Sequence, residues 1–289
     1  YVPEGGTTLT NDVGTAPGIY IKWNDKILIL LPGPPRELKP MFHNHVIPLI
    51  KQNFIIKTRT INTIGIGEST LEMRLKDIIK EKNNPSIATY AKQGSVEIKI
   101  TARGTDKITI DKLLDESVKK ISERIDQYIY SYNDETIEEV VYKKLKKKGM
   151  RIAFCESCTG GLISSRFTQI PGVSEIFDRG IISYSNKSKI EELGVKGDTL
   201  NRYGAVSQQT AIEMAKGLYH KAKVDIALSI TGIAGPTGGT EDKPVGLVYI
   251  GIVNKNKCHT IKCLFNGDRN SIQYRAASTA FDELRKFLD

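Results

Sequence analysis

The sequence predicts an α/β protein in which a layered α/β domain follows two smaller units. In residues 132–289, apolar strand-like runs alternate with helical patterns, an order typical of layered α/β domains. Two of these strands run directly into glycine-rich loops, and α/β domains bind ligands at loops of this kind. Residues 53–131 show the order β-α-β-β-α instead, which indicates a small α+β domain.

The sequence of residues 1–52 predicts a β-hairpin followed by a helix. Turn residues separate two apolar runs, Tyr20–Trp23 and Lys26–Leu31, which indicates paired strands. Arg36–Ile50 has helical periodicity. A piece of this size hardly builds its own core, so we interpret it as half of a larger domain. Because the chain begins at Tyr1, already inside a loop rich in glycine and threonine, we expect a fragment or a processed product.

Residues 53–131 predict three strands and two helices. The expected elements are, in chain order, Ile55–Ile64, Glu68–Lys80, Ser86–Ala91, Val96–Ala102 and Ile108–Tyr128. This unit contains no cluster of residues suited to catalysis. Its Gly65-Ile-Gly67 turn is too short for a basic Gly-x-x-Gly clamp on a nucleic-acid backbone, so RNA binding is not expected.

Residues 132–289 carry the elements of the predicted α/β domain. The expected helices are Glu135–Lys148, Lys187–Leu193, Ser207–Ala222 and Ser271–Leu288. The expected strands are Ile152–Cys155, Gly180–Tyr184, Asp225–Ile230, Gly246–Val253 and His259–Leu264. The two glycine-rich loops are Ser157–Gly161 and Thr231–Gly239. Neither loop fits the Walker or the dinucleotide-binding fingerprint, so each loop alone is weak evidence for a ligand site. The presence of both loops in one domain is stronger evidence.

Composition excludes several classes of protein. With 39% hydrophobic and 26% charged residues in 289, the chain is typical of soluble globular proteins. Its longest apolar run, Ile27–Leu31, is too short to cross a bilayer, and four cysteines favour a reducing cytoplasm. The net charge of +9 could attract phosphorylated ligands. The lysine-rich stretch at 143–148 lacks interleaved aromatic residues, so we interpret it as a solvated helix face.

Ser157 is the candidate nucleophile. A strand, a tight turn and a helix surround it, which exposes a side chain and aims free backbone N–H groups at it. Such a serine needs a base, and none of the four histidines lies in a loop next to a sharp turn. A Ser-Lys or Ser-Tyr-Lys arrangement remains, with Tyr184 and either Lys187 or Lys189. The alternative is structural: a capping serine, a core tyrosine and two solvated lysines.

Cys155-Glu-Ser-Cys158 is a C-x-x-C sequence, which allows a redox interpretation. Cys258 and Cys263 would complete a zinc site only with loose spacing. Strand alternation makes Cys155 a core residue, so neither chemistry is expected.

Four motifs of the third unit occur together. They are Glu156-Ser-Cys-Thr-Gly-Gly161, Tyr184-Ser-Asn186 with Lys189, Tyr203-Gly-Ala-Val-Ser207, and Ser229-Ile-Thr-Gly-Ile-Ala-Gly-Pro236 with Lys243-Pro-Val-Gly246. In this order they resemble the CinA family of competence/damage-inducible proteins, and residues 132–289 resemble its C-terminal nicotinamide mononucleotide (NMN) deamidase domain. Residues 53–131 resemble its KH-like module, and residues 1–52 resemble the second half of its molybdopterin-binding-like domain.

The resemblance implies a cytoplasmic amidohydrolase that converts NMN to nicotinic acid mononucleotide and ammonia, without metal or cofactor, and that forms a homodimer. By motif, the catalytic residues are Ser157, Tyr184 and Lys189, of which Lys189 acts as the base directly or through Tyr184. Substrate contacts are expected from two groups of residues. Backbone N–H groups of Thr159, Gly160 and Gly161 would bind the oxyanion, and the phosphate would lie near Thr231, Gly232, Gly235 and Arg179.

The sequence departs from the family pattern in two places. Cys155 stands where alanine is common, which makes the C-x-x-C sequence accidental. The first half of the molybdopterin-binding-like domain, with its glycine- and aspartate-rich stretch, is missing from this sequence, so we expect no ADP-ribose pyrophosphatase activity. The alternative function is a non-catalytic protein that binds nucleotides or nucleic acid through the same loops.

Overall fold

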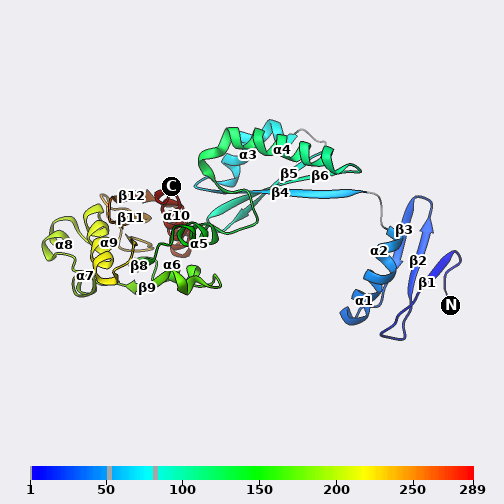
Figure 1. Cartoon of the computed structure of the whole chain (residues 1–289), viewed down its shortest axis with the longest axis horizontal. Helices are drawn as coiled ribbons and strands as arrows, with labels where there is room; N and C mark the ends of the chain where they lie inside the picture. Colours follow the sequence, from blue (N-terminus) through cyan, green and yellow to red (C-terminus); the bar gives the residue numbers. More distant parts are fainter. Residues whose placement is uncertain (1, 51–53, 81–83) are drawn as a thin grey trace. The chain divides into compact units, whose positions relative to one another are not determined.

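The computed structural model describes residues 2–50, 54–80 and 84–289, and the chain divides into two compact units, Tyr1–Ile55 and Ile56–Asp289 (Figure 1). Tyr1 and the predicted boundary at residues 52 and 53 lie outside the described residues. Within the described part of the chain, no helix is both long enough and apolar enough to cross a membrane.

The first unit is a three-stranded antiparallel sheet with a helical segment. Its strands are β1 (Gly6–Leu9), β2 (Gly18–Trp23) and β3 (Lys26–Leu30), in that order. The predicted hairpin is confirmed by the pairing of β2 with β3. The predicted helix is three consecutive pieces: α1 (Pro35–Met41), a π-helical turn η1 (Phe42–Val46) and α2 (Ile47–Ile50). Pro40 lies inside α1 and removes an N–H donor there, and the π-helical turn follows directly.

The second unit begins with a small α+β domain. Its four-stranded sheet has the order β5-β6-β4-β7, and its two helices are α3 (Glu68–Lys80) and α4 (Lys107–Ile125). The strands are β4 (Ile55–Ile64), β5 (Ser86–Lys92), β6 (Ser95–Gly104) and β7 (Ile129–Ser131). The predicted order of elements is confirmed up to α4. The short strand β7 was not predicted, because helical periodicity continues to Tyr128 although the helix ends at Ile125.

The rest of the second unit is built on a five-stranded sheet of order β12-β11-β10-β8-β9. The strands are β8 (Ile152–Glu156), β9 (Phe177–Ile182), β10 (Ile226–Gly232), β11 (Leu247–Asn254) and β12 (Cys258–Leu264). β8 pairs in parallel with both β9 and β10, whereas β11 and β12 are antiparallel to their neighbours. The carboxyl ends of β8, β9 and β10 therefore meet at one edge of the sheet.

Helices cover both faces of this sheet, so that the sheet and its two sets of helices form three layers (Figure 1). This arrangement confirms the predicted layered α/β fold. Side chains of β8 alternate between the faces. Ile152 and Phe154 belong to the core beneath α5 (Ile137–Lys148), α6 (Leu162–Phe167) and α10 (Arg269–Phe287). Ala153 and Cys155 belong to the core beneath α7 (Asn186–Leu193), α8 (Gly197–Tyr203) and α9 (Gln208–Ala222).

The residues that begin and end these helices follow known capping rules. Ser207 caps α9 by accepting a hydrogen bond from the Thr210 N–H, as predicted. Thr136 forms a capping box with Glu139 at the start of α5, and Gly149 ends that helix in the left-handed conformation. Helix α8 was not predicted, because seven residues give too little periodicity to recognise.

The packing of α9 against α7 generates the first test. A Cβ atom added at Gly217 would lie 1.7 Å from the Leu193 carbonyl oxygen, at the end of α7. Alanine normally favours a helix over glycine by about 1 kcal/mol. At this position we expect the opposite effect: Gly217→Ala should destabilise this domain by about 2 kcal/mol, because α7 and α9 must separate to admit the methyl group.

Native-state hydrogen exchange of the α9 amides measures this domain by itself. Gly197→Ala, at the start of α8, is the matched control, because nothing lies within 4 Å of its added Cβ. Equal protection of the α9 amides from exchange in Gly217→Ala and Gly197→Ala would show that the added methyl group does not separate α7 from α9.

Candidate active site

A cavity of about 180 Å³ lies at the sheet edge where the three parallel strands end. Ser157 follows β8, Tyr184 follows β9, and Thr231 is next to the last residue of β10. The structure brings these three predicted residues together although more than seventy positions separate the first from the last. The cavity is lined by Ser157, Cys158, Tyr184, Lys189, Ala205, Val206, Thr231, Gly232, Ala234 and Arg269.

The Lys189 side chain reaches the Ser157 hydroxyl. Lys189 belongs to the first half of α7, which Ser185 caps, and the residue is only 1% exposed. Its Nζ lies 2.9 Å from Ser157 Oγ, 2.8 Å from the Ser183 carbonyl oxygen and 3.3 Å from the Tyr184 carbonyl oxygen. A neutral amine has two N–H donors and one lone pair. An ammonium at this position donates to all three oxygens, whereas a neutral amine donates to the two carbonyl oxygens and turns its lone pair toward the Ser157 hydroxyl.

Burial lowers the pKa of Lys189 below its ordinary value of 10.5, because a buried ammonium loses its hydration. The thiols of Cys158 and Cys155 act in the opposite direction only where they are ionised. Burial also raises the pKa of the Cys158 thiol to about 12, and it raises the pKa of Cys155 further, so both thiols are neutral near pH 7. The surroundings of Lys189 therefore favour the uncharged amine that a base requires.

Several backbone N–H groups of the loop after β8 are already bonded. Ser157 N–H donates to the Ile230 carbonyl oxygen at 3.0 Å, and Gly160 N–H donates to the Ser157 carbonyl oxygen at 3.1 Å. Gly161 N–H donates to the Glu156 carboxylate at 3.1 Å. Among the described residues, the N–H groups of Cys158 and Thr159 have no acceptor. They are the donors that this loop can still offer to a ligand.

Arg269 is a cavity residue that sequence reasoning missed. It is the first residue of α10, directly after the capping residue Asp268. Its guanidinium donates to the Gly235 carbonyl oxygen at 2.7 Å and to the Tyr184 hydroxyl at 2.9 Å. The Tyr184 phenol is 61% exposed and bonds to Arg269, whereas the Lys189 amine bonds directly to Ser157. A proton relay through Tyr184 is thus not formed in this structure.

The other predicted binding residues lie in different places. Thr231 and Gly232 line the cavity, and the Thr231 hydroxyl donates to the Ala205 carbonyl oxygen at 2.9 Å. Gly235 contributes only a carbonyl oxygen, which Arg269 binds. Arg179 is exposed on β9 and pairs with Asp178, so its guanidinium is not among the groups that line the cavity. Arg179 belongs to β9, the edge strand of the sheet, and this position leaves its guanidinium in solvent.

The cysteines do not gather at one site. Cys155 is buried in the core, where its Sγ lies 3.6 Å from the Leu228 carbonyl oxygen, and Cys158 lines the cavity. All four cysteines are free thiols, and Cys258 and Cys263 belong to the edge strand β12. Across residues 2–50, 54–80 and 84–289, no three His, Cys, Asp or Glu side chains are placed to share a metal ion.

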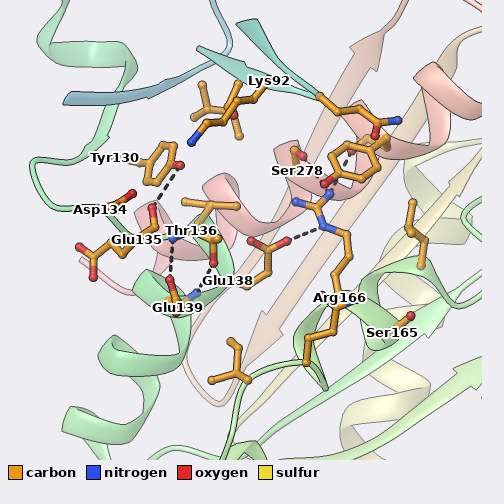
Figure 2. Close-up of a pocket in the computed structure, with 18 of the residues that line it drawn as sticks. Lys92, Tyr130, Asp134, Glu135, Thr136, Glu138, Glu139, Ser165, Arg166 and Ser278 are labelled. Atoms are coloured by element: carbon orange, nitrogen blue, oxygen red, sulfur yellow. Dashed lines mark hydrogen bonds and ion pairs between the residues drawn. The ribbon is translucent and has the colours of Figure 1, made fainter. Parts of the chain in front are cut away.

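A second cavity of about 600 Å³ is larger but has different chemistry (Figure 2). Two of its charged side chains, Arg166 and Glu138, pair with each other, and Arg166 Nη1 also donates to the Ser278 hydroxyl at 2.9 Å (Figure 2). Glu139 closes the capping box of α5. Among its described lining residues, no serine bonds to a lysine or a histidine. These groups stabilise the domain, and the smaller cavity is the candidate site.

Fold and cavity together define a layered α/β protein in which a buried lysine bonds to a serine at the carboxyl end of the parallel strand β8. The chain belongs to the CinA family. The family model of the CinA C-terminal domain matches residues 134–288, and that of the damage-inducible protein CinA KH domain matches residues 58–131.

Relatives named CinA-like protein align with the whole of this chain. A CinA-like protein of Kosmotoga olearia is 47% identical over 290 residues, which cover 100% of this chain and 70% of the relative. A CinA-like protein of Dictyoglomus thermophilum is 46% identical, with 71% of the relative covered. Among solved structures, the competence/damage inducible protein CihA from Agrobacterium tumefaciens is 37% identical, with a TM-score of 0.50. That match covers 54% of this chain and 97% of the other.

The buried amine predicts how stability depends on pH. The pKa of Lys189 is lowered in the folded protein, so the folded state loses its proton at a lower pH than the unfolded chain does. Between these two pKa values the unfolded chain binds more protons, and stability rises with pH. We expect the unfolding free energy of the wild type to increase relative to that of Lys189→Met as the pH rises toward 10.5, the ordinary pKa of a lysine.

Hydrogen exchange of the α9 amides, referred to the intrinsic exchange rate at each pH, measures this difference. Lys187→Met is the control, because Lys187 is 81% exposed in its side chain. A difference between wild type and Lys189→Met that stays constant over this range would refute the expected pKa shift.

Proposed function

We propose that this chain is an amidohydrolase that converts NMN to nicotinic acid mononucleotide and ammonia, with Ser157 as nucleophile and Lys189 as base. The distance of 2.9 Å between Lys189 Nζ and Ser157 Oγ, inside a cavity at the sheet edge, is the observation that carries the proposal. A serine hydroxyl becomes nucleophilic only beside a base, and a lysine becomes a base only when burial favours its neutral form. Both conditions meet in this pair, and membership in the CinA family supports the choice of reaction.

In the first half of the reaction, Ser157 Oγ attacks the carboxamide carbon of the substrate, while the Lys189 amine accepts the hydroxyl proton. The carbonyl oxygen gains negative charge. The N–H groups of Cys158 and Thr159 are the loop donors available to it, and each such donor can be worth roughly 3 to 4 kcal/mol. The Lys189 ammonium then returns the proton to the nitrogen of the substrate, which leaves as ammonia, and an ester on Ser157 remains.

In the second half, a water molecule attacks this ester. The neutral Lys189 amine accepts a proton from the water and delivers it to Ser157 Oγ as the ester bond breaks. The product is nicotinic acid mononucleotide, and the enzyme returns to its starting state. The carbonyl oxygens of Ser183 and Tyr184 hold the amine in place through both steps.

Arg269 is the cation suited to the phosphate of the substrate. Sites that enclose a drug-sized ligand measure about 300 to 1,000 Å³. This cavity measures about 180 Å³, so it can hold only the reacting end of a nucleotide, and the remainder must extend toward the mouth. Arg269 contacts the exposed Tyr184 phenol there, and a guanidinium binds phosphate through two parallel hydrogen bonds.

Ser157→Ala removes the nucleophile and tests the proposal directly. We expect it to reduce ammonia release from NMN at least 10³-fold, because no acyl-enzyme can form. Lys189→Ala should lower kcat about as much, whereas Lys187→Ala should change it less than twofold, because Lys187 is exposed and pairs with Glu191 on the helix surface. Ammonia and nicotinic acid mononucleotide are measured together, in the presence of EDTA.

Cys155→Ala is the control for thiol chemistry and should keep its activity. Equal losses in Lys187→Ala and Lys189→Ala would exclude Lys189 as the specific base. Absence of turnover in the wild type, accompanied by salt-dependent RNA binding, would support the non-catalytic alternative instead.

Arg269→Gln tests the phosphate contact. Loss of a bidentate contact to phosphate should raise KM for NMN at least tenfold while kcat falls less, because the reacting amide does not contact this side chain in the proposed complex. Arg275→Gln on the same helix is the matched control, since Arg275 binds the Asn266 carbonyl oxygen and does not line the cavity. An unchanged KM in Arg269→Gln would place the phosphate elsewhere.

A further inference from the structure

Glu156, the residue before Ser157, is a buried carboxylate with an unusual number of donors. It is the last residue of β8 and is 0% exposed. Its Oε2 accepts hydrogen bonds from the Thr159 hydroxyl at 2.7 Å, the Ile163 N–H at 3.0 Å and the Gly161 N–H at 3.1 Å. Its Oε1 accepts from the Ser164 N–H at 2.8 Å and the Ser164 hydroxyl at 2.7 Å.

All five donors belong to the loop after Ser157 or to the first turn of α6. One side chain at the end of β8 therefore holds both the loop and the helix that follows it. No Lys, Arg or His in the described part of the chain forms an ion pair with Glu156. Its charge is stabilised by N–H groups at the start of α6 and by two hydroxyls, so the loop geometry and the buried charge depend on each other.

These bonds also determine which backbone donors stay available. Glu156 engages the N–H groups of Gly161, Ile163 and Ser164, and the Gly160 N–H bonds inside the turn. The N–H groups of Cys158 and Thr159, the two residues after Ser157, are left. Gln273 supports the same turn from α10, where its Nε2 donates to the Cys158 carbonyl oxygen at 2.7 Å.

We propose that Glu156 is a positioning residue, which holds the turn so that the Ser157 hydroxyl and the N–H groups of Cys158 and Thr159 face one reacting carbonyl or phosphonyl group. It does not contact the substrate and transfers no proton. The inference rests on the proposed function only in its choice of Ser157 as nucleophile. A reagent that reacts with activated serines tests it without NMN.

Glu156→Gln is the informative change, because it keeps the shape of the side chain. Its amide nitrogen is a donor and replaces one of the two accepting oxygens, so the variant loses up to three of the five bonds. Glu138→Gln is the matched control: Glu138 is also a buried carboxylate of this domain, but it pairs with Arg166 in the other cavity. Folding of each variant is checked by circular dichroism and thermal unfolding.

Two readouts follow for each variant. The first is the rate at which an alkyl fluorophosphonate labels Ser157, measured by mass spectrometry. In that step Ser157 Oγ bonds to phosphorus, fluoride leaves, and Lys189 accepts the proton. The second is kcat and KM with NMN. We expect Glu156→Gln to lower the labelling rate and kcat about 100-fold, with KM within threefold of the wild type. Glu138→Gln should match the wild type in both.

A folded Glu156→Gln variant with labelling and kcat within twofold of the wild type would overturn the proposal, and so would an equal loss in Glu138→Gln. If the wild type is labelled but does not hydrolyse NMN, the proposed function fails, while the labelling rates still decide the role of Glu156. If Glu156→Gln does not fold, Thr159→Val and Ser164→Ala each remove one hydroxyl donor. A labelling rate that is at least threefold lower in both supports the proposal, and unchanged rates refute it.

Discussion

The pairing of Ser157 with a basic Lys189 depends on the exclusion of water from the Lys189 amine. An exposed lysine is an ammonium with three donors and no lone pair, and it could only donate a hydrogen bond to the Ser157 hydroxyl. Burial makes the charged form costly, and the carbonyl oxygens of Ser183 and Tyr184 supply acceptors for the two remaining N–H groups. The three-layer packing provides this burial, because α7 lies against α9 and holds the amine under the sheet edge.

The sheet explains how distant segments share one site. Parallel strands end at the same edge, so the loops after β8, β9 and β10 converge without any contact between them in the sequence. Three charged residues from different parts of the chain have different roles around the cavity. Glu156 orders a turn from within, Lys189 faces a hydroxyl, and Arg269 stands at the mouth of the cavity. Lys189 and Arg269 share one neighbour, because the first bonds to the Tyr184 carbonyl oxygen and the second to the Tyr184 hydroxyl.

Sequence reasoning recovered the elements that have long periodic patterns and the loop that carries Ser157. It could not choose between Lys187 and Lys189 from spacing alone, because two positions on one helix point to opposite sides and the buried side is set by packing. The family resemblance made that choice, and in the structure Lys189 is the buried residue of the two. Arg269 was missed because its neighbour Tyr184 is 85 positions away and no local pattern links them. Gly161 was named as an oxyanion donor because the sequence does not reveal that the Glu156 carboxylate takes its N–H.

Helix α10 closes the site from one side, and it is translated after every other part of the cavity. Arg269 reaches the mouth of the cavity, and Gln273 reaches the turn beside Ser157. Phe281 packs onto Phe154 of β8. A nascent chain that has reached β12 already contains the serine and the lysine, yet its sheet still exposes the apolar face that α10 covers. The site can therefore be completed only once α10 has been translated, and a chain truncated before α10 has neither a covered core nor a complete cavity.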